Sequence, residues 1–317
     1  MKEVSVGKRV HQQRRYLLPI HGFLCCLVIG TLLFSLAWLL VGCRPQQRTS
    51  GADVSGPAQT IENKGSDTLV NLALAWAEAY IELHPDEARI SVTGGGSGTG
   101  IAAMINGTVD IANVSRAMKP EEIAAAEANG ITPVEFAVAR DAIAVVVHPS
   151  NPVDGLTLQQ ISDIYTGRIT NWSQVGGEDR PIVLLSRESN SGTYVYFLEN
   201  VIRMGKKESD LLFSPDTLLM PSSEGISVEV RQNPNAIGYD GLGYVTPDQK
   251  VVAVARDANS PYVLPSVDTV NDGSYPVSRP LYMYTAGEPT GDIKAYLDWI
   301  LSEGQALVPK LGFVPLR

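Results

Sequence analysis

The sequence predicts an α/β fold that is large enough to form two lobes. After about residue 60, short apolar segments typical of buried strands alternate with helical segments, which is the pattern of α/β proteins. A chain of 317 residues can bury one large core or two of ordinary domain size, and two are favoured. Two glycine-rich turns, 94–100 and 186–194, each connect an apolar strand to a helix.

The first part of the chain has the pattern of an export signal. Basic residues precede an apolar run over 17–42, which ends in Leu40-Val41-Gly42-Cys43. The tetrapeptide resembles a bacterial lipobox, whose cysteine is lipidated and becomes the mature N-terminus. We expect residues 1–42 to be a lipoprotein signal peptide, Cys43 to carry lipid and residues 43–62 to form a flexible tether. The alternative is an uncleaved transmembrane anchor. In both cases the remaining chain lies outside the cytoplasm, at the cell surface or in the periplasm.

Cysteine and histidine usage exclude several kinds of chemistry. All three cysteines, Cys25, Cys26 and Cys43, lie in or at the end of the export segment, so the mature domain has no disulfide. Its two histidines, His84 and His148, are too few and too far apart in sequence for a histidine-based metal site. We therefore expect no metal and no cofactor.

The charge balance argues against a nucleic-acid partner. Residues 1–42 contain five of the 25 basic residues and one of the 34 acidic residues, so the rest has 20 basic and 33 acidic residues, a net charge of −13. Nucleic-acid-binding domains are basic instead. An anion site remains possible, because net charge controls long-range steering and not the local field in a cleft.

Along the chain, local signals predict the elements in order. A helix over 70–83 ends at His84-Pro85, and a helix over 120–129 has Pro120 near its start and Gly130 after its end. The apolar stretch 134–147 is interrupted at 139–141 by Ala-Arg-Asp. The remaining helices are expected over 156–165, 194–202, from about 226 and over 291–303; strands are expected over 90–93, 110–114, 182–185, 236–245, 251–255 and 280–285.

The two glycine-rich turns are candidate anion sites. Glycine lets the backbone turn sharply and approach a ligand closely, and a following helix start presents unpaired N–H groups and a positive dipole end. Ser97 in the first turn and Ser191 and Thr193 in the second add hydroxyl donors, and Arg187 adds a bidentate fork. We expect the N–H groups of Gly98, Gly192 and Thr193 to face the same space.

Enzymatic interpretations of these turns fail on specific residues. Neither turn has the lysine of a nucleotide P-loop. The loose dinucleotide pattern at 98–103 lacks the long crossover helix that a Rossmann unit needs. Thr99 and Ser189 stand where a serine-hydrolase elbow requires glycine. A secreted phosphatase or esterase that used Ser97 or Ser191 as its nucleophile would also need a partner histidine, and neither histidine is a credible one. We therefore expect that the protein is not an enzyme.

Several motifs together resemble the phosphate-binding proteins of phosphate-specific ABC importers. They include Gly65-Ser66-Asp67-Thr68, Gly96-Ser97-Gly98-Thr99-Gly100, Ser115-Arg116 after Asp110-Ile111-Ala112, and the Arg187 turn ending in Ser191-Gly192-Thr193. The segments 164–172 and 236–239 are also typical of that family. The resemblance covers nearly all of residues 61–317. Carried over residue by residue, the family's ligand contacts fall on Ser66, Asp67, Thr68, Ser97, Ser115, Arg116, Arg187, Ser191, Gly192 and Thr193.

The resemblance implies a type II periplasmic-binding-protein fold with the ligand in the cleft between two lobes. Lobe I would comprise 58–139 plus 246–317, and lobe II 140–245. The function implied is capture of inorganic phosphate by hinge closure and delivery to the membrane subunits of an ABC permease, by a monomer tethered to the membrane through its lipid. One alternative is that the protein binds another tetrahedral oxyanion, such as sulfate or molybdate. Another is that it is a phosphate sensor or adhesin without a role in transport.

The sequence departs from the family at one position. Many members have an aspartate after the second strand that accepts a hydrogen bond from protonated phosphate, and here that place reads Ser115-Arg116. Our hypothesis is that Asp67, opposite Arg116, supplies the acceptor and so rejects sulfate, which has no proton to donate. Alternatively, Asp67 only caps the helix that starts near Leu69.

Overall fold

The structure is a computed structural model that describes residues 60–86 and 89–316. Contacts divide the chain into Met1–Ser55 and Gly56–Arg317, and the described residues all belong to the second unit. The expected signal peptide, Cys43 and all but the last three residues of the expected tether lie outside the described residues. Within those described stretches, no helix is both long and apolar enough to cross a membrane.

Strands and helices alternate through the described part, as predicted for an α/β protein. The strands are β1 (Thr60–Gly65), β2 (Arg89–Thr93), β3 (Ile111–Val114), β4 (Val134–Val147), β5 (Gly155–Thr157), β6 (Val183–Arg187), β7 (Leu218–Met220), β8 (Ala236–Gly241), β9 (Lys250–Ala255) and β10 (Ser278–Thr285). The α-helices are α2 (Asp67–Leu83), α3 (Ser97–Ile105), α4 (Pro120–Ala128), α5 (Leu158–Tyr165), α6 (Gly192–Phe197), α7 (Ser223–Gln232), α8 (Val267–Asn271) and α9 (Gly291–Leu301).

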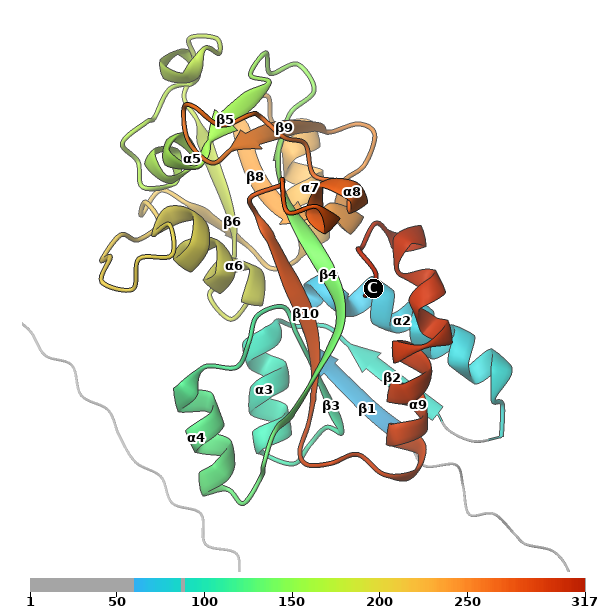
Figure 1. The fold of residues 1–317 in the computed structure, drawn as a ribbon. Helices are drawn as coiled ribbons and strands as arrows, with labels where there is room; N and C mark the ends of the chain where they lie inside the picture. The colour runs from blue at the N-terminus through green and yellow to red at the C-terminus, as the bar shows by residue number, and fades with distance from the viewer. Residues whose placement is uncertain (1–59, 87–88, 317) are drawn as a thin grey trace, which may run out of the picture. The chain divides into compact units, whose positions relative to one another are not determined.

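Two long strands connect the two halves of this unit. The strand order is β2-β1-β3-β10-β4-β8-β6-β7, with β5 and β9 joined to it through β4. Strands β1, β2 and β3 are parallel, as are β6, β7 and β8, whereas β10 and β4 run antiparallel to each other. In Figure 1, β4 and β10 run between a half built on β1–β3 and a half built on β5, β6, β8 and β9.

Helix α2 shows how the sequence fixes one of these elements. Leu69, Leu72, Ala73 and Trp76 are buried at the spacing of one helical face, so the helix packs that face on the core. The helix begins at Asp67, three residues earlier than predicted. It ends where Pro85 follows His84, because the residue before a proline avoids helical geometry.

The core clusters change the expected lobe boundary. Val252 of β9 and Val270 of α8 belong to the same buried cluster as Ile161 and Tyr239 in the second half. Strand β9 also pairs with Val145–Val147 of β4 and with β5. Residues 250–277 therefore pack with the second half, and the expected return to lobe I at residue 246 comes too early.

Strand β4 is unbroken where an interruption was expected. Residues 139–141 continue the strand, and Asp141 lies opposite Arg279 in the register with β10. The charge of Asp141 is tolerated within the strand because Arg279 on the neighbouring strand forms an ion pair with it. The irregularity is one residue of β4: Leu281 and Tyr282 of β10 pair with Ala139 and Ala137, so Val138 is left without a partner in the register.

The remaining differences between the predicted and the observed helices and strands involve short elements. The helix predicted from 156 begins at Leu158, after β5, with Thr157 as its N-cap accepting from the Gln160 N–H. The helix predicted over 194–202 is α6 followed by a π-helical turn, Leu198–Ile202. Strand β7 and helix α8 were not predicted, since segments of three and five residues are too short to show a hydrophobic period.

Candidate functional site: a buried polar cluster between two turns

The two glycine-rich turns are in direct contact. The Gly98 N–H donates to the Asn190 carbonyl at 3.0 Å, and Asn190 Nδ2 donates to the Gly95 carbonyl at 3.0 Å. Gly96 has φ +97°, and a Cβ there would lie 2.9 Å from the Asn190 oxygen. The predicted meeting of the turns is confirmed. The expectation that the Gly98 N–H faces a ligand is wrong, because the neighbouring turn accepts it.

Beside this contact, two serine hydroxyls face one glycine. Ser97 Oγ lies 3.2 Å from Ser115 Oγ and accepts the Ser115 N–H at 3.0 Å. A Cβ on Gly192 would stand 2.3 Å from Ser97 Oγ and 2.5 Å from Ser115 Oγ. Ser97 begins α3, Ser115 follows β3 and Gly192 begins α6. Three predicted site residues therefore converge from three elements, and both serines are fully buried.

A threonine pair extends the cluster. Thr68 Oγ1, in the first turn of α2, lies 2.8 Å from Thr193 Oγ1 in α6, and both side chains are buried. Ser191 is the N-cap of α6, and its Oγ accepts the Thr193 N–H at 3.2 Å. The Thr193 N–H and the Ser191 hydroxyl oxygen therefore bond to each other, where we expected both to face a ligand. Ser66 is buried directly before α2, and its N–H donates to the Asn113 carbonyl.

Arg187 lies fully buried at the end of β6. Its Nη1 donates to Ser223 Oγ at 2.8 Å and lies 3.1 Å from Asp67 Oδ2, and its Nη2 donates to the Pro221 carbonyl at 3.1 Å. Asp67 Oδ2 also accepts the Ser223 N–H at 2.7 Å. Asp67 is thus paired with Arg187, and our hypothesis that it stands opposite Arg116 is wrong in this respect.

Arg116 is paired with a glutamate. Its guanidinium donates to both carboxylate oxygens of Glu122 in α4, at 2.7 and 2.6 Å. Burial raises the pKa of the Glu122 carboxyl, but the bond from Arg116 and other donors outweigh it and hold the pKa below its usual value. Arg116 lines a cavity of about 410 Å³ together with Arg279. Its expected role as a ligand-binding residue remains a prediction.

Three charged residues of the cluster escaped the sequence analysis. Asp141 of β4 and Arg279 of β10 form a fully buried ion pair of 3.0 Å. Asp240 of β8 is also buried, and burial raises its pKa to about 7 although the nearby Arg187 charge lowers it. Asp141 had one signal in the sequence, its place in an apolar stretch. Arg279 had none.

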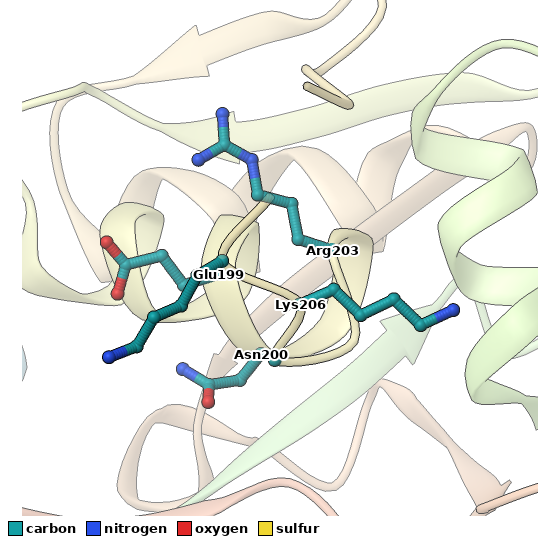
Figure 2. A pocket seen from close by; sticks show the side chains of 6 residues that line it. Glu199, Asn200, Arg203 and Lys206 are labelled. Carbon is teal, nitrogen blue, oxygen red and sulfur yellow. The ribbon is translucent and has the colours of Figure 1, made fainter. Parts of the chain in front are cut away.

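A second cavity, of about 330 Å³, is lined by Glu199 and Asn200 of the π-helical turn and by residues that follow it. Figure 2 shows that the Arg203 and Lys206 side chains point in different directions, so their charges do not converge on one point. Arg203 Nε is already bound to the Leu211 carbonyl at 2.9 Å. This cavity therefore lacks the convergent donors of the cluster between the turns.

The cluster is suited to hold an anion by local dipoles and not to carry out catalysis. The Ser97 hydroxyl is paired with Ser115, and Ser191 caps a helix, so neither has the base partner of an activated nucleophile. Within residues 60–86 and 89–316, no group of three or more His, Cys, Asp or Glu side chains could hold a metal ion.

Comparison with known proteins identifies the relatives of the chain. Residues 51–304 match the family described as PBP superfamily domain. The chain is 36% identical over 280 residues to the phosphate-binding protein PstS of Pseudomonas aeruginosa, covering 83% of this chain and 84% of that protein. It is 33% identical over 257 residues to PstS of Bacillus subtilis, with coverage of 80% and 79%.

Solved structures agree with these relatives. A Clostridium perfringens protein assigned as a phosphate ABC transporter substrate-binding protein, with bound phosphate, is similar with a TM-score of 0.73 at 35% identity, covering 81% of this chain and 100% of that one. An ABC-type phosphate transport receptor from Vibrio cholerae has a TM-score of 0.64 at 29% identity, covering 81% and 100%.

Proposed function

Since this chain belongs to the PstS family of phosphate-binding proteins, we propose that its buried polar cluster holds one inorganic phosphate ion between the two glycine-rich turns. The chain is the phosphate-binding component of a phosphate ABC importer and has no catalytic turnover. The observation that carries the site assignment is the convergence of Ser97, Ser115 and Gly192, from three separate elements, in one buried place.

The balance of charges in the cluster supports a site that holds an anion mainly through dipoles. The guanidinium groups of Arg187 and Arg279 are balanced by neighbouring aspartates, so the cluster has no large excess of positive charge. The hydroxyl groups of the cluster and the positive dipole ends at the starts of α3 and α6 supply the remaining attraction. Closing a cleft around the ion strengthens each of these bonds, because the local dielectric constant falls.

The capture mechanism we propose is hinge closure about β4 and β10. One lobe comprises residues up to 139 together with those from 278 onward, and the other comprises 140–277. The Ser223 N–H donates to Asp67 Oδ2, and the hydroxyls of Thr68 and Thr193 bond to each other. These bonds join the two lobes and support a closed arrangement stabilised by contacts around the ion. The closed form then delivers phosphate to the membrane subunits of the permease.

We also propose that the chain is anchored outside the cytoplasm by lipid on Cys43. The tetrapeptide 40–43 supports this proposal. Cells labelled with radioactive palmitate should yield a labelled wild-type chain and an unlabelled Cys43→Ala variant. Equal labelling of both would exclude Cys43 as the attachment point.

Calorimetric titration of the full-length chain in detergent with phosphate, sulfate and molybdate tests the binding function. We expect phosphate to bind most tightly of the three. A chain that binds no phosphate, or binds sulfate or molybdate more tightly, contradicts the proposal.

A further inference from the structure

The cavity of about 410 Å³ is lined by both proposed lobes. Arg116 and Met118 line it from one lobe, and Tyr196 and Asn200 line it from the other. Arg279 of the connecting strand β10 completes this part of the lining. Sites for small organic ligands have volumes of this order. A molecule bound in the cavity would therefore contact both lobes at once.

Both arginines of the lining keep an N–H group without a partner. The two Nη groups of Arg116 donate to Glu122. Arg279 donates its Nε and Nη2 groups to Asp141 and its Nη2 group also to Thr193. Arg116 Nε and Arg279 Nη1 are buried and have no hydrogen-bond partner among the described residues. Since an unpaired buried donor is costly, an oxyanion in the cavity would be stabilised by accepting from these groups.

The charges around the cavity favour a ligand with a single oxyanion group. The carboxylates of Glu122 and Asp141 already balance the two arginines. Lys119 adds a further cation to the lining, and Glu199 adds a carboxylate. The cavity therefore offers donors without a large excess of positive charge, which does not suit a polyanion.

Apolar side chains form another part of the lining. They are those of Met118, Pro120, Tyr196, Pro280 and Tyr282. A bare inorganic oxyanion gains nothing from apolar surface, whereas an apolar or aromatic group is stabilised by leaving water and by packing on the tyrosine rings. The lining therefore fits an organic molecule that has an oxyanion group and an apolar body.

Tyr196 brings the charged and apolar parts of the lining together. Its hydroxyl donates to the Ser278 carbonyl at 2.7 Å, which fixes the ring. The guanidinium carbon of Arg279 lies 5.5 Å from the centre of this ring. An oxyanion group on Arg279 would thus leave the body of the same ligand beside the tyrosine.

Arg279 also connects the cavity to the proposed phosphate site. Its Nη2 donates to Thr193 Oγ1 at 2.8 Å, and Thr193 Oγ1 lies 2.8 Å from Thr68 Oγ1 in the cluster. Because both lobes line the cavity, its occupant binds the closed form better than an open one. Such an occupant raises the affinity for phosphate, and phosphate raises the affinity for the occupant by the same factor.

We propose that this cavity is a second binding site, for a small organic oxyanion, and that its occupant stabilises the closed, phosphate-loaded form. Arg116 Nε and Arg279 Nη1 donate to the oxyanion group, and Tyr196 contacts the apolar body. The effect on closure rests on the proposed phosphate function.

Calorimetry on the full-length chain in detergent, already saturated with phosphate, tests the binding site with phenylphosphonate as the probe. We expect the probe to bind, and methylphosphonate, which has the same oxyanion group without the ring, to bind about tenfold more weakly or worse. Absence of phenylphosphonate binding, or equal binding of the two phosphonates, overturns the proposal.

A pair of matched variants tests the placement of the oxyanion group. Arg116→Gln should weaken phenylphosphonate binding about fivefold or more, because it removes a donor of the cavity. Arg180→Gln is the control, since Arg180 also pairs with a glutamate, Glu178, and does not line the cavity. Equal affinity for the probe in Arg116→Gln and the wild type, or an equal loss in both variants, contradicts the placement.

The wild type alone tests the coupling. We expect saturating phenylphosphonate to raise phosphate affinity about fivefold or more. An unchanged phosphate affinity overturns the effect on closure, and a lowered one shows that the probe competes at the phosphate site, which overturns the separate cavity site. Either result leaves the phosphate function standing, whereas absence of phosphate binding contradicts that function itself.

Discussion

At the scale of single residues, the site depends on one position that has no side chain. Gly192 lies where a Cβ would come within 2.3 Å of Ser97 Oγ and 2.5 Å of Ser115 Oγ. Its φ is not in the left-handed region, so alanine would suit the backbone and fail only for lack of space. The glycine is therefore required by close approach between elements and not by the turn.

Gly192→Ala should lower phosphate affinity about tenfold or more while the chain still folds, because overpacking by one methyl separates α6 from Ser97 and Ser115. Titration calorimetry measures the affinity, and circular dichroism checks the fold. Gly287→Ala is the control, since a Cβ there has nothing within 4 Å and the affinity should not change. Wild-type affinity in Gly192→Ala would contradict the placement of this residue.

Asp240 should make stability depend on pH. Burial raises its pKa to about 7, so between about pH 4 and 7 the folded chain holds a proton that the unfolded chain has lost. The free energy of unfolding therefore falls as pH rises through this window, by at most about 1.4 kcal/mol per pH unit for one proton.

Urea unfolding of the wild type and Asp240→Asn at pH 4.5, 6 and 7.5, without ligand, tests this expectation. The variant should lose less stability than the wild type on going from pH 4.5 to 7.5. The same pH dependence in both proteins would show that Asp240 titrates normally.

At the scale of elements, helix starts position the site. Ser191 caps α6 by accepting the Thr193 N–H, and this fixes the threonine that contacts both Thr68 and Arg279. Helices α2 and α3 likewise bring Thr68 and Ser97 to their first turns. The position of Thr193 in the proposed site therefore depends on the N-cap of α6.

Ser191→Ala should destabilise the chain by about 1 kcal/mol through loss of the cap, and it should also weaken phosphate binding by moving Thr193. Ser266→Ala is the matched control, because Ser266 caps α8 by accepting the Thr269 N–H at 3.1 Å. It should cost similar stability with no change in affinity. Thermal unfolding and calorimetry measure the two effects, and an unchanged affinity in Ser191→Ala would contradict the coupling.

The sequence predicted the local part of this arrangement better than the long-range part. Glycine, serine and threonine between a strand and a helix have a local signature, so Ser97, Gly192 and Thr193 could be found. The ion pair between Arg116 and Glu122 could not be predicted, because Glu122 is only one of several nearby acidic residues. Asp141 could be recognised in the sequence as a charged residue within an apolar stretch. Its role could not be inferred, because it depends on the ion pair with Arg279, which is 138 residues away.

At the scale of the whole described unit, two strands hold the site together. Strands β4 and β10 run from one half to the other (Figure 1). Asp141 of β4 and Arg279 of β10 are partners in the register between them. Hydrogen bonds between segments far apart in sequence, such as the bond from the Ser223 N–H to Asp67 Oδ2, join the two halves beside the cluster. We therefore expect the affinity of the proposed site to depend on the relative position of the two halves.

The central claim is that one phosphate ion lies between the two glycine-rich turns, and a crystal structure of the protein with phosphate tests it most directly. The account predicts phosphate oxygens within hydrogen-bond distance of Ser97, Thr68 and Thr193. Phosphate bound instead in the cavity beside Arg203 and Lys206, with the cluster between the turns unchanged, would contradict it.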